Sequence, residues 1–131
     1  MVAAALLNND GKILVQKRKA DGAHGGLWEF PGGKLEPGES PESGLIRELV
    51  EELGIRLEAD SLEWVASSSE PADPDQARKP IVIELYTCRT WQGEPQCLDA
   101  QQLGWFAPAE LAGLNMPPLD VDMIPALLRA I

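Results

Sequence analysis

The chain has 131 residues, of which 44% are hydrophobic and 24% are charged, and its net charge is −10 at pH 7. These proportions are typical of a soluble globular protein, and the length predicts a single domain over residues 1–131. The acidic balance argues against a nucleic-acid polymer as partner, because binding to its phosphates needs a basic face. The negative charge is compatible with a small polyphosphate ligand if divalent cations lie between protein and ligand.

No apolar stretch approaches the ~20 residues of a membrane span. The apolar start, Val2–Leu7, is too short for a signal peptide and lacks its basic residues. We therefore expect a cytoplasmic protein with no membrane partner. Cys88 and Cys97 lack the spacing of a thiolate metal site, which predicts two free thiols. The sequence favours neither a monomer nor an oligomer.

The first part of the chain predicts two strands. Val2–Leu7 is apolar throughout, as in a buried strand, and Ile13–Arg18 follows as the second strand. Between them Asn8–Gly11 contains the pair Asp-Gly, which is typical of a tight hairpin turn. We expect a loop over residues 20–26 and a short extended segment over Leu27–Phe30, which ends at a Pro-Gly-Gly sequence.

A helix is predicted over Pro41–Leu53, with signals at both ends. Ser40 suits the N-cap, Pro41 suits the first helical position, and Glu42 favours the positive end of the helix dipole. Gly54 can close the helix in the left-handed conformation.

The second half predicts further strands and a closing helix. Strands and helices alternate there without a βαβ repeat, which predicts an α/β (α+β) fold with a mixed sheet covered by two helices. The expected elements are strands over Arg56–Ser69, Ile81–Thr90 and Gly104–Ala107, a proline-rich loop over 70–80, a helical turn over Pro108–Leu111 and a closing helix over Asp122–Ala130.

Glutamates gather on one side of the predicted helix. Because each helical residue advances by about 100°, Glu48, Glu51 and Glu52 share an arc of about 100°, with Arg47 beside them. We call these three glutamates the acidic cluster. The same rotation places the apolar residues on the opposite, core-facing side, namely Leu45, Ile46, Leu49, Val50 and Leu53.

Two interpretations of the acidic cluster are open. A solvated helix face is the commoner reason for a run of charges, yet like charges three or four residues apart repel one another. Carboxylates at this spacing also suit oxygen-seeking cations such as Mg²⁺ or Mn²⁺. The flexible Gly32-Gly33 pair could bring the Gly32 carbonyl to such a cation, and Glu39 can reach the same cluster.

The segment around the cluster resembles the Nudix box, G-x5-E-x7-R-E-U-x-E-E-x-G-U, where U is a bulky aliphatic residue. The chain fills every specified position, with Gly33, Glu39, Arg47, Glu48, Leu49, Glu51, Glu52, Gly54 and Ile55. The Nudix family consists of Mg²⁺-dependent hydrolases that cleave nucleoside diphosphates linked to another moiety. The resemblance implies the Nudix α/β/α sandwich, with a mixed β-sheet flanked by helices.

The similarity extends to the MutT-type branch of the family, which hydrolyses nucleoside triphosphates. Trp28–Lys34 resembles the lead-in to the box in that branch, and Trp91–Pro95 followed by Trp105 also resembles it. The pair Pro117-Pro118 followed by an acidic residue is a further point of similarity. This branch attacks the β-phosphorus and releases a nucleoside monophosphate and pyrophosphate.

The resemblance also implies roles for individual residues. Arg47 would orient a carboxylate, Glu48 first of all, by a bidentate contact, and Glu39 would support the cluster. Glu48 is the first candidate for the general base and Glu52 the second. Lys34 would touch the phosphates, or else be an exposed loop lysine. The implied metal ligands are Glu48, Glu51, Glu52, the Gly32 carbonyl and Asp99, with Mg²⁺ or Mn²⁺ as the cation.

The expected nucleobase pocket lies between Arg18, Trp28–Phe30, the strand from Ile81 and Asp120. Core packing is the alternative role for at least one of Trp28 and Phe30. Asp120 matches the position where an asparagine reads oxidised guanine in the MutT branch. An ionised carboxylate only accepts hydrogen bonds, so Asp120 favours bases that present amino groups, unless it is held protonated.

A second difference from the enzyme for oxidised guanine lies in the first loop, where Ala23 matches a histidine position and His24 is its neighbour. 8-oxo-dGTP, CTP and dCTP are therefore all candidate substrates. Hydrolysis of 8-oxo-dGTP would imply a role in DNA repair, by removing oxidised nucleotides from the pool. Two alternatives are a Nudix hydrolase of another nucleoside diphosphate-linked compound and a catalytically inactive nucleotide-binding regulatory module.

Overall fold

The protein is described by a computed structural model of the chain, in which all residues except 21–24, 74 and 76–78 are placed. The predicted loops over 20–26 and 70–80, and the positions Ala23 and His24, lie wholly or partly outside the described residues. The α-helices are α1 (Pro41–Leu53) and α2 (Pro118–Ala130). The strands are β1 (Val2–Leu6), β2 (Ile13–Lys17), β3 (Trp28–Glu29), β4 (Gly32–Gly33), β5 (Leu62–Glu70), β6 (Ile81–Cys88) and β7 (Gln102–Phe106).

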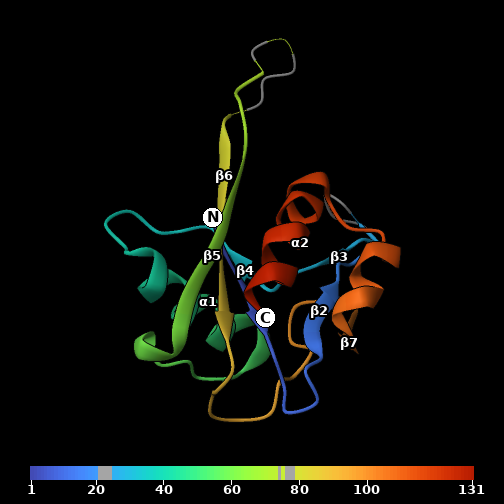
Figure 1. Cartoon of the computed structure of the whole chain (residues 1–131). Coiled ribbons are helices and arrows are strands. Elements are labelled where there is room, and N and C mark those ends of the chain that lie inside the picture. Colours follow the sequence, from blue (N-terminus) through green and yellow to red (C-terminus); the bar gives the residue numbers. More distant parts are fainter. Residues whose placement is uncertain (21–24, 74, 76–78) are drawn as a thin grey trace.

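The strands form two sheets. The larger is mixed and has the order β4-β1-β6-β5, with β1 parallel to β6 and the other pairs antiparallel. The smaller is antiparallel and has the order β3-β2-β7. Figure 1 shows α1 and α2 on opposite sides of the larger sheet, with α2 between it and the smaller sheet. This arrangement confirms the predicted fold of mixed strands flanked by helices.

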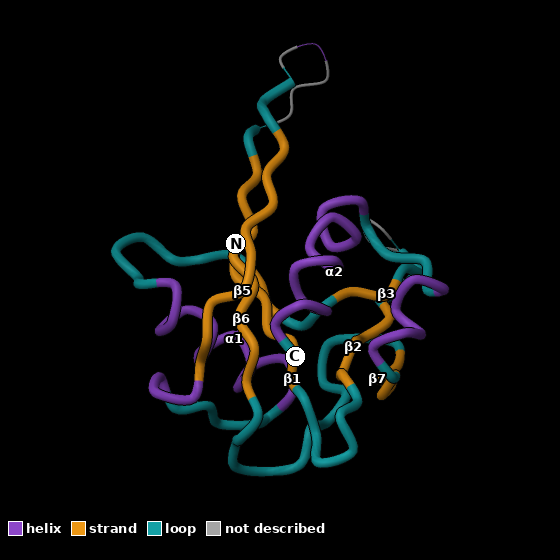
Figure 2. Tube along the Cα trace, viewed as in Figure 1, coloured by secondary structure: helices purple, strands orange, loops and turns teal. Residues whose placement is uncertain are grey.

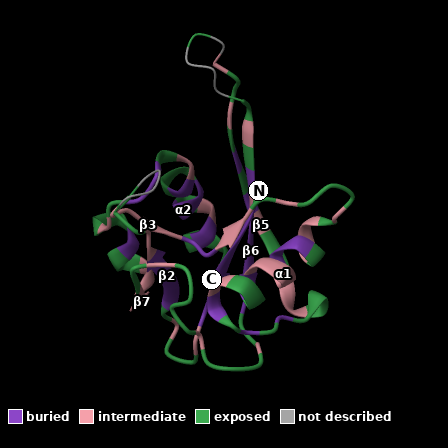
Figure 3. Ribbon diagram, turned by 180° about the vertical axis from the view of Figure 1, so that it is seen from behind, coloured by how far each residue is buried: buried purple, intermediate pink, exposed green. Residues whose placement is uncertain are grey.

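β1 is apolar at every position because it is buried on both faces. Its even-numbered residues pack with α1, and its odd-numbered residues pack with α2. Leu49 of α1 and Leu127 of α2, each 0% exposed, are central to these two core layers. Figure 3 shows the buried strands running through the middle of the molecule between the helices. A strand covered on both faces reads as a continuous apolar run, as its sequence predicts.

The predicted hairpin between the first two strands is only partly correct. Its turn is present, since Gly11 N–H donates to the Asn8 carbonyl at 3.0 Å and Gly11 has a φ of 74°. However, β1 and β2 belong to different sheets, and among the described residues their segments are joined by a single β-bridge, between Leu7 and Ile13. The two strands diverge from this bridge because β1 pairs with β6 while β2 pairs with β7 (Figure 2).

Several other predicted boundaries need correction. The strand expected over Arg56–Ser69 begins only at Leu62, because Ala59–Ser61 forms a 3₁₀ turn closed by the Ser61 N–H and the Glu58 carbonyl. The closing helix begins four residues before Asp122, at Pro118, since proline lacks the N–H that a first helical residue leaves unpaired. Strand β6 ends at Cys88, β7 begins at Gln102, and the helical turn from Pro108 continues to Gly113 as a 3₁₀ helix. Among the described residues, no helix is long and apolar enough to cross a membrane.

Candidate active site

Helix α1 carries the acidic cluster and has the predicted bounds. The Ser40 hydroxyl accepts from the Ser43 N–H at 3.2 Å, and Gly54 ends the helix with a φ of 67°. Leu49 is fully buried, as are Leu45 and Leu53, so one stripe of the helix faces the sheet. Val50 was predicted in the core but is 47% exposed. It lies at the edge of the apolar arc, beyond the stripe that reaches the sheet.

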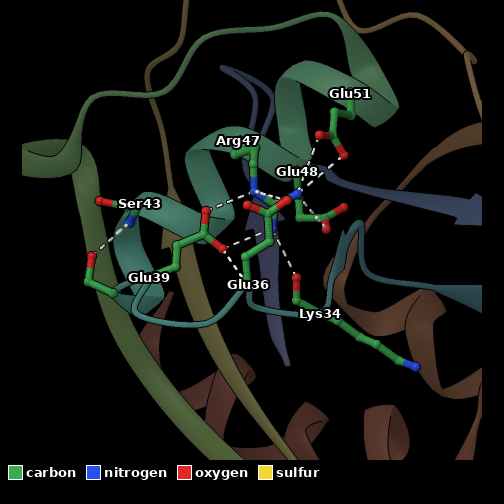
Figure 4. Close-up of polar contacts among 8 residues, drawn as sticks. Lys34, Glu36, Glu39, Ser43, Arg47, Glu48 and Glu51 are labelled. Carbon is green, nitrogen blue, oxygen red and sulfur yellow. Dashed lines mark hydrogen bonds and ion pairs between the residues drawn. The ribbon is translucent and has the colours of Figure 1, made fainter.

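Arg47 is the centre of a polar network at the start of the site (Figure 4). Its Nε and Nη2 donate to the two carboxylate oxygens of Glu39 at 2.8 and 2.9 Å. Its Nη1 donates to Glu48 at 3.1 Å and to Glu51 at 3.3 Å, and Nη2 also donates to the Lys34 carbonyl at 3.0 Å. The bidentate contact predicted with Glu48 is therefore made with Glu39, and Glu48 receives a single hydrogen bond.

These contacts fix Glu39 as an anion that joins the loop to the helix. Its carboxylate also accepts from the Glu36 N–H at 2.9 Å. The Arg47 hydrogen bonds, reinforced by this backbone donor, lower the pKa of Glu39 to about 2. Glu39 stays charged at neutral pH and holds Arg47 in place against the acidic cluster.

Glu48 lies against the backbone of β4. A Cβ atom at Gly33 would collide with the Glu48 carboxylate, so only glycine lets this side chain pack there. Its side chain is 13% exposed. Burial raises the pKa of Glu48, the hydrogen bond from Arg47 opposes that rise, and the nearby Glu51 charge adds to it.

Glu52 is directed toward the sheets rather than toward solvent. Its Oε2 accepts from Gln16 Nε2 at 2.7 Å and from the Gly32 N–H at 3.3 Å. Burial raises the pKa of Glu52 to about 7, with the charges of Glu29 and Glu48 adding to the rise. The predicted metal-ligand role of the Gly32 carbonyl stays a prediction, whereas the Gly32 N–H is seen to bind Glu52.

Gln16 and Glu29 also belong to this region, although the sequence did not predict them as site residues. Gln16 also donates to Glu29 at 3.4 Å, and Glu29 pairs with Arg18 at 3.0 Å. Burial raises the pKa of Glu29 to about 7, which the charge of Arg18 opposes and the charge of Asp120 increases. The available signals were a glutamine in the otherwise apolar start of β2 and a glutamate between two aromatic residues.

The residues predicted for the nucleobase have different surroundings. Asp120, in the first turn of α2, is 7% exposed and its Oδ2 accepts from the Phe30 N–H at 3.1 Å. Burial raises the pKa of Asp120 to about 6. The Phe30 ring is buried in the core, while Trp28 is partly buried and packs edge-to-face on Phe106 at 5.2 Å. Core packing is therefore the observed role of the Phe30 ring.

Lys34 and Asp99 lie at the surface. Figure 4 shows the Lys34 side chain directed away from the carboxylates, although its carbonyl accepts from Arg47. Asp99 is exposed in the loop before β7. Its neighbour Leu98 donates an N–H to the Glu52 carbonyl at 3.3 Å, which fastens this loop to the end of α1.

The donor set of the acidic cluster suits a hard divalent cation, since all its side-chain ligands are carboxylate oxygens. Among the described residues, no group of three acidic, histidine or cysteine side chains is placed closely enough to hold a metal ion as the structure stands. The reason is visible in the contacts, because Arg47 binds Glu48 and Glu51 while Gln16 binds Glu52. Burial is the main cause of the raised pKa of Glu48 and Glu52, and the charges of neighbouring glutamates add to it; a cation would relieve this repulsion.

Comparisons with known proteins identify the family of the chain. The family model described as NUDIX domain matches residues 1–127. A CTP pyrophosphohydrolase of Escherichia coli is 38% identical over 127 residues, which cover 97% of this chain and 90% of that protein. An 8-oxo-dGTP diphosphatase of Escherichia coli is 33% identical over 129 residues, which cover 98% and 95%. The solution structure of the Escherichia coli ORF135 protein is 36% identical with a TM-score of 0.83, covering 98% of this chain and 86% of that one.

The sheets flanked by helices carry the complete box, which runs from Gly33 through α1 to Ile55, and the comparisons show that the chain belongs to the Nudix family of hydrolases. It is a pyrophosphohydrolase, an enzyme that acts on acid anhydrides. The family generally uses a divalent metal, in keeping with the oxygen donors of the acidic cluster.

Proposed function

We propose that the protein hydrolyses a nucleoside triphosphate to a nucleoside monophosphate and pyrophosphate with the help of Mg²⁺. The observation that carries the proposal is the carboxylate set on α1, in which Arg47 binds Glu48 and Glu51 while Gln16 binds Glu52. These carboxylates, with the Gly32 carbonyl and Asp99, would hold Mg²⁺, for which Mn²⁺ is a chemical substitute.

The bound cation would neutralise phosphate charge and lower the pKa of a bound water. The chain's own residues supply the rest of the chemistry. Glu48, or Glu52 in its place, accepts the proton of the attacking water. Arg47 and Glu39 keep the cluster in position through their paired hydrogen bonds.

The proposed reaction is a displacement at the β-phosphorus. A bond forms between the water oxygen and this phosphorus, and the bond from it to the α,β-bridging oxygen breaks. The nucleoside monophosphate leaves with that bridging oxygen, and pyrophosphate carries the oxygen of the water. Lys34 is the proposed contact to the phosphates, because its exposed side chain is free to turn toward a ligand.

For the base, we favour a cytosine nucleotide, CTP or dCTP, over 8-oxo-dGTP. Asp120 already accepts a hydrogen bond from the Phe30 N–H, and as a carboxylate it can accept a further one from a base amino group but repels a base carbonyl such as O6 of guanine. Cytosine presents such an amino group, and a relative at 38% identity is a CTP pyrophosphohydrolase. Arg18 and Trp28 complete the proposed pocket. An 8-oxo-dGTP diphosphatase at 33% identity makes oxidised guanine the competing substrate and pool cleaning the competing role.

The test is a panel of nucleoside triphosphates, including CTP, dCTP and 8-oxo-dGTP, incubated with the protein and Mg²⁺. We expect pyrophosphate and monophosphate in equal amounts, with Glu52→Gln inactive and the exposed Glu58→Gln fully active as the matched control. Release of orthophosphate alone, or no turnover of any triphosphate, would overturn the reaction. Preference for 8-oxo-dGTP would overturn only the choice of base.

A further inference from the structure

Gln16 is a polar residue in an apolar strand. The residues before it in β2, from Ile13 to Val15, are all 0% exposed, and Gln16 itself is 3% exposed. Its Nε2 donates to Glu52 at 2.7 Å and, more weakly, to Glu29 at 3.4 Å. In the structure the amide nitrogen faces both side chains, which as carboxylates only accept hydrogen bonds, and the amide oxygen therefore faces away from them.

That amide oxygen has no hydrogen-bond partner among the described residues, although it is fully buried. A buried acceptor without a donor weakens folding, because it has lost its hydrogen bonds to water. A leucine or methionine at position 16 would fill the strand position without this penalty. Core packing alone therefore does not explain why a glutamine stands there.

The position of the amide suggests what it does. On one side it binds Glu52, the member of the acidic cluster that also accepts from the Gly32 N–H. On the other side it reaches Glu29, whose carboxylate pairs with Arg18 in the proposed nucleotide pocket. Gln16 thus lies between the proposed cation ligands and the residues proposed to meet the nucleotide.

We propose that Gln16 is a positioning residue, which holds the Glu52 carboxylate in place for the cation and links it to Glu29, and whose free oxygen accepts a hydrogen bond from a donor that arrives with the ligand. This inference rests on the proposed function, because it assigns Glu52 to the cation. A water held by the cation and an amino group of the nucleotide are donors of the required kind. Groups that hold metal ligands in this way typically change metal affinity or activity by about 10–100-fold when they are replaced.

The test compares Gln16→Leu with Gln102→Leu. Gln102 is an exposed glutamine in β7, the strand paired with β2, so the control makes the same chemical change on the same sheet. Mg²⁺ binding to the metal-free protein is measured by calorimetry without nucleotide, and thermal unfolding is measured with and without Mg²⁺. Turnover of the preferred triphosphate gives kcat and KM separately.

For Gln16→Leu we expect a melting temperature without Mg²⁺ at or slightly below that of the wild type, because the change removes an unpaired buried oxygen but also removes the donor to Glu52. We also expect Mg²⁺ affinity about tenfold weaker or more, and a kcat lower by a similar factor. Gln102→Leu should match the wild type in all three measurements. Unchanged Mg²⁺ affinity and kcat in Gln16→Leu would overturn the inference, since the glutamine would then be a structural residue only.

Should Gln16→Leu fail to fold, Gln16→Met replaces it, because methionine is unbranched and close in length to glutamine. Failure of both variants to fold would also overturn the inference, because it would show that the amide supports the core. A wild type without Mg²⁺ binding or turnover would contradict the proposed function itself. Normal wild-type behaviour together with a normal Gln16→Leu would contradict the role of Gln16 alone.

Discussion

Arg47 and Glu39 are joined by two parallel hydrogen bonds, Nε to Oε2 at 2.8 Å and Nη2 to Oε1 at 2.9 Å. The pair fastens the loop before α1 to the helix, and the remaining Arg47 nitrogen is then directed at Glu48 and Glu51. Arg47 therefore bridges the Glu39 carboxylate in the loop and the acidic cluster on the helix. Lysine cannot reproduce this arrangement, because its ammonium group lacks the planar fork.

Arg47→Lys should consequently lower kcat/KM for the triphosphate by about 10–100-fold, the range typical of residues that hold metal ligands. The fold should survive, because the network lies at the edge of the protein and α1 is held by its apolar stripe. Steady-state kinetics and circular dichroism on the same samples measure the two effects. The exposed Arg56, changed to lysine, is the control and should keep full activity. A fully active Arg47→Lys would show that the paired contact with Glu39 has no part in the reaction.

Divalent metal should raise the melting temperature, because it would relieve the repulsion within the acidic cluster. In the double variant Glu51→Gln and Glu52→Gln that rise should disappear, since two of the proposed oxygen ligands lose their charge. Differential scanning fluorimetry with and without Mg²⁺ measures the shift, and Glu58→Gln serves as the exposed control. Persistence of the full shift in the double variant would place the metal site elsewhere.

The sequence predicted α1 to the residue because several independent signals coincide there. Ser40, Pro41 and Gly54 mark its ends, and all three act in the structure as their chemistry suggests. The three glutamates were predicted on the side opposite the apolar residues, but only Glu51 is exposed there, whereas Glu48 and Glu52 are largely covered by other elements. What the helical angle could not tell is which carboxylate is covered by other elements, since that depends on β2 and β4.

The errors lie where distant segments decide the outcome. The pairing of β1 with β6 rather than with β2 depends on a strand 80 residues further along, and a turn signal at Asn8–Gly11 carries no information about it. Gln16 and Glu29 were missed for the same reason. Their local signals, a polar residue in an apolar strand and a glutamate between aromatic residues, do not indicate a partner. Gln16 binds Glu52, which is 36 residues away, and Glu29 is linked to Glu52 through Gln16.

Glu29 should make the metal-free protein less stable as pH rises. Its pKa is about 7 in the folded protein and 4.5 ordinarily, so between these values the folded state holds a proton that the unfolded chain has released. Stability then falls with rising pH in this window, by at most about 1.4 kcal/mol per pH unit for one group. Urea denaturation at pH values from 4.5 to 7, with metal removed by a chelator, should show a shallower fall for Glu29→Gln. Glu58→Gln should follow the wild type, and equal slopes in all three proteins would contradict the assignment.

Leu49 and Val50 are neighbours on α1 with opposite surroundings, 0% and 47% exposed. Leu49→Ala should lower the free energy of unfolding by about 2–5 kcal/mol, because it leaves a cavity between α1 and the larger sheet. Val50→Ala should change it by no more than about 0.5 kcal/mol, as surface substitutions usually do. Urea denaturation of both variants measures the difference. Comparable losses would mean that the apolar face of α1 is wider than the structure shows.

Asp120 should control which base is accepted. Asp120→Asn keeps an oxygen that can accept from the Phe30 N–H, and it adds an amide donor that a carboxylate lacks. A donor at this position favours a base with a carbonyl group over one with an amino group. We therefore expect the ratio of kcat/KM for 8-oxo-dGTP to that for dCTP to rise by about tenfold or more, the scale of one gained and one lost polar contact. The exposed Asp122, two residues further along α2, is the matched control as Asp122→Asn and should leave the ratio unchanged. An unchanged ratio in Asp120→Asn would show that Asp120 only binds the Phe30 N–H and does not select the base. Arg18 and Glu29 would then be the candidates for base selection.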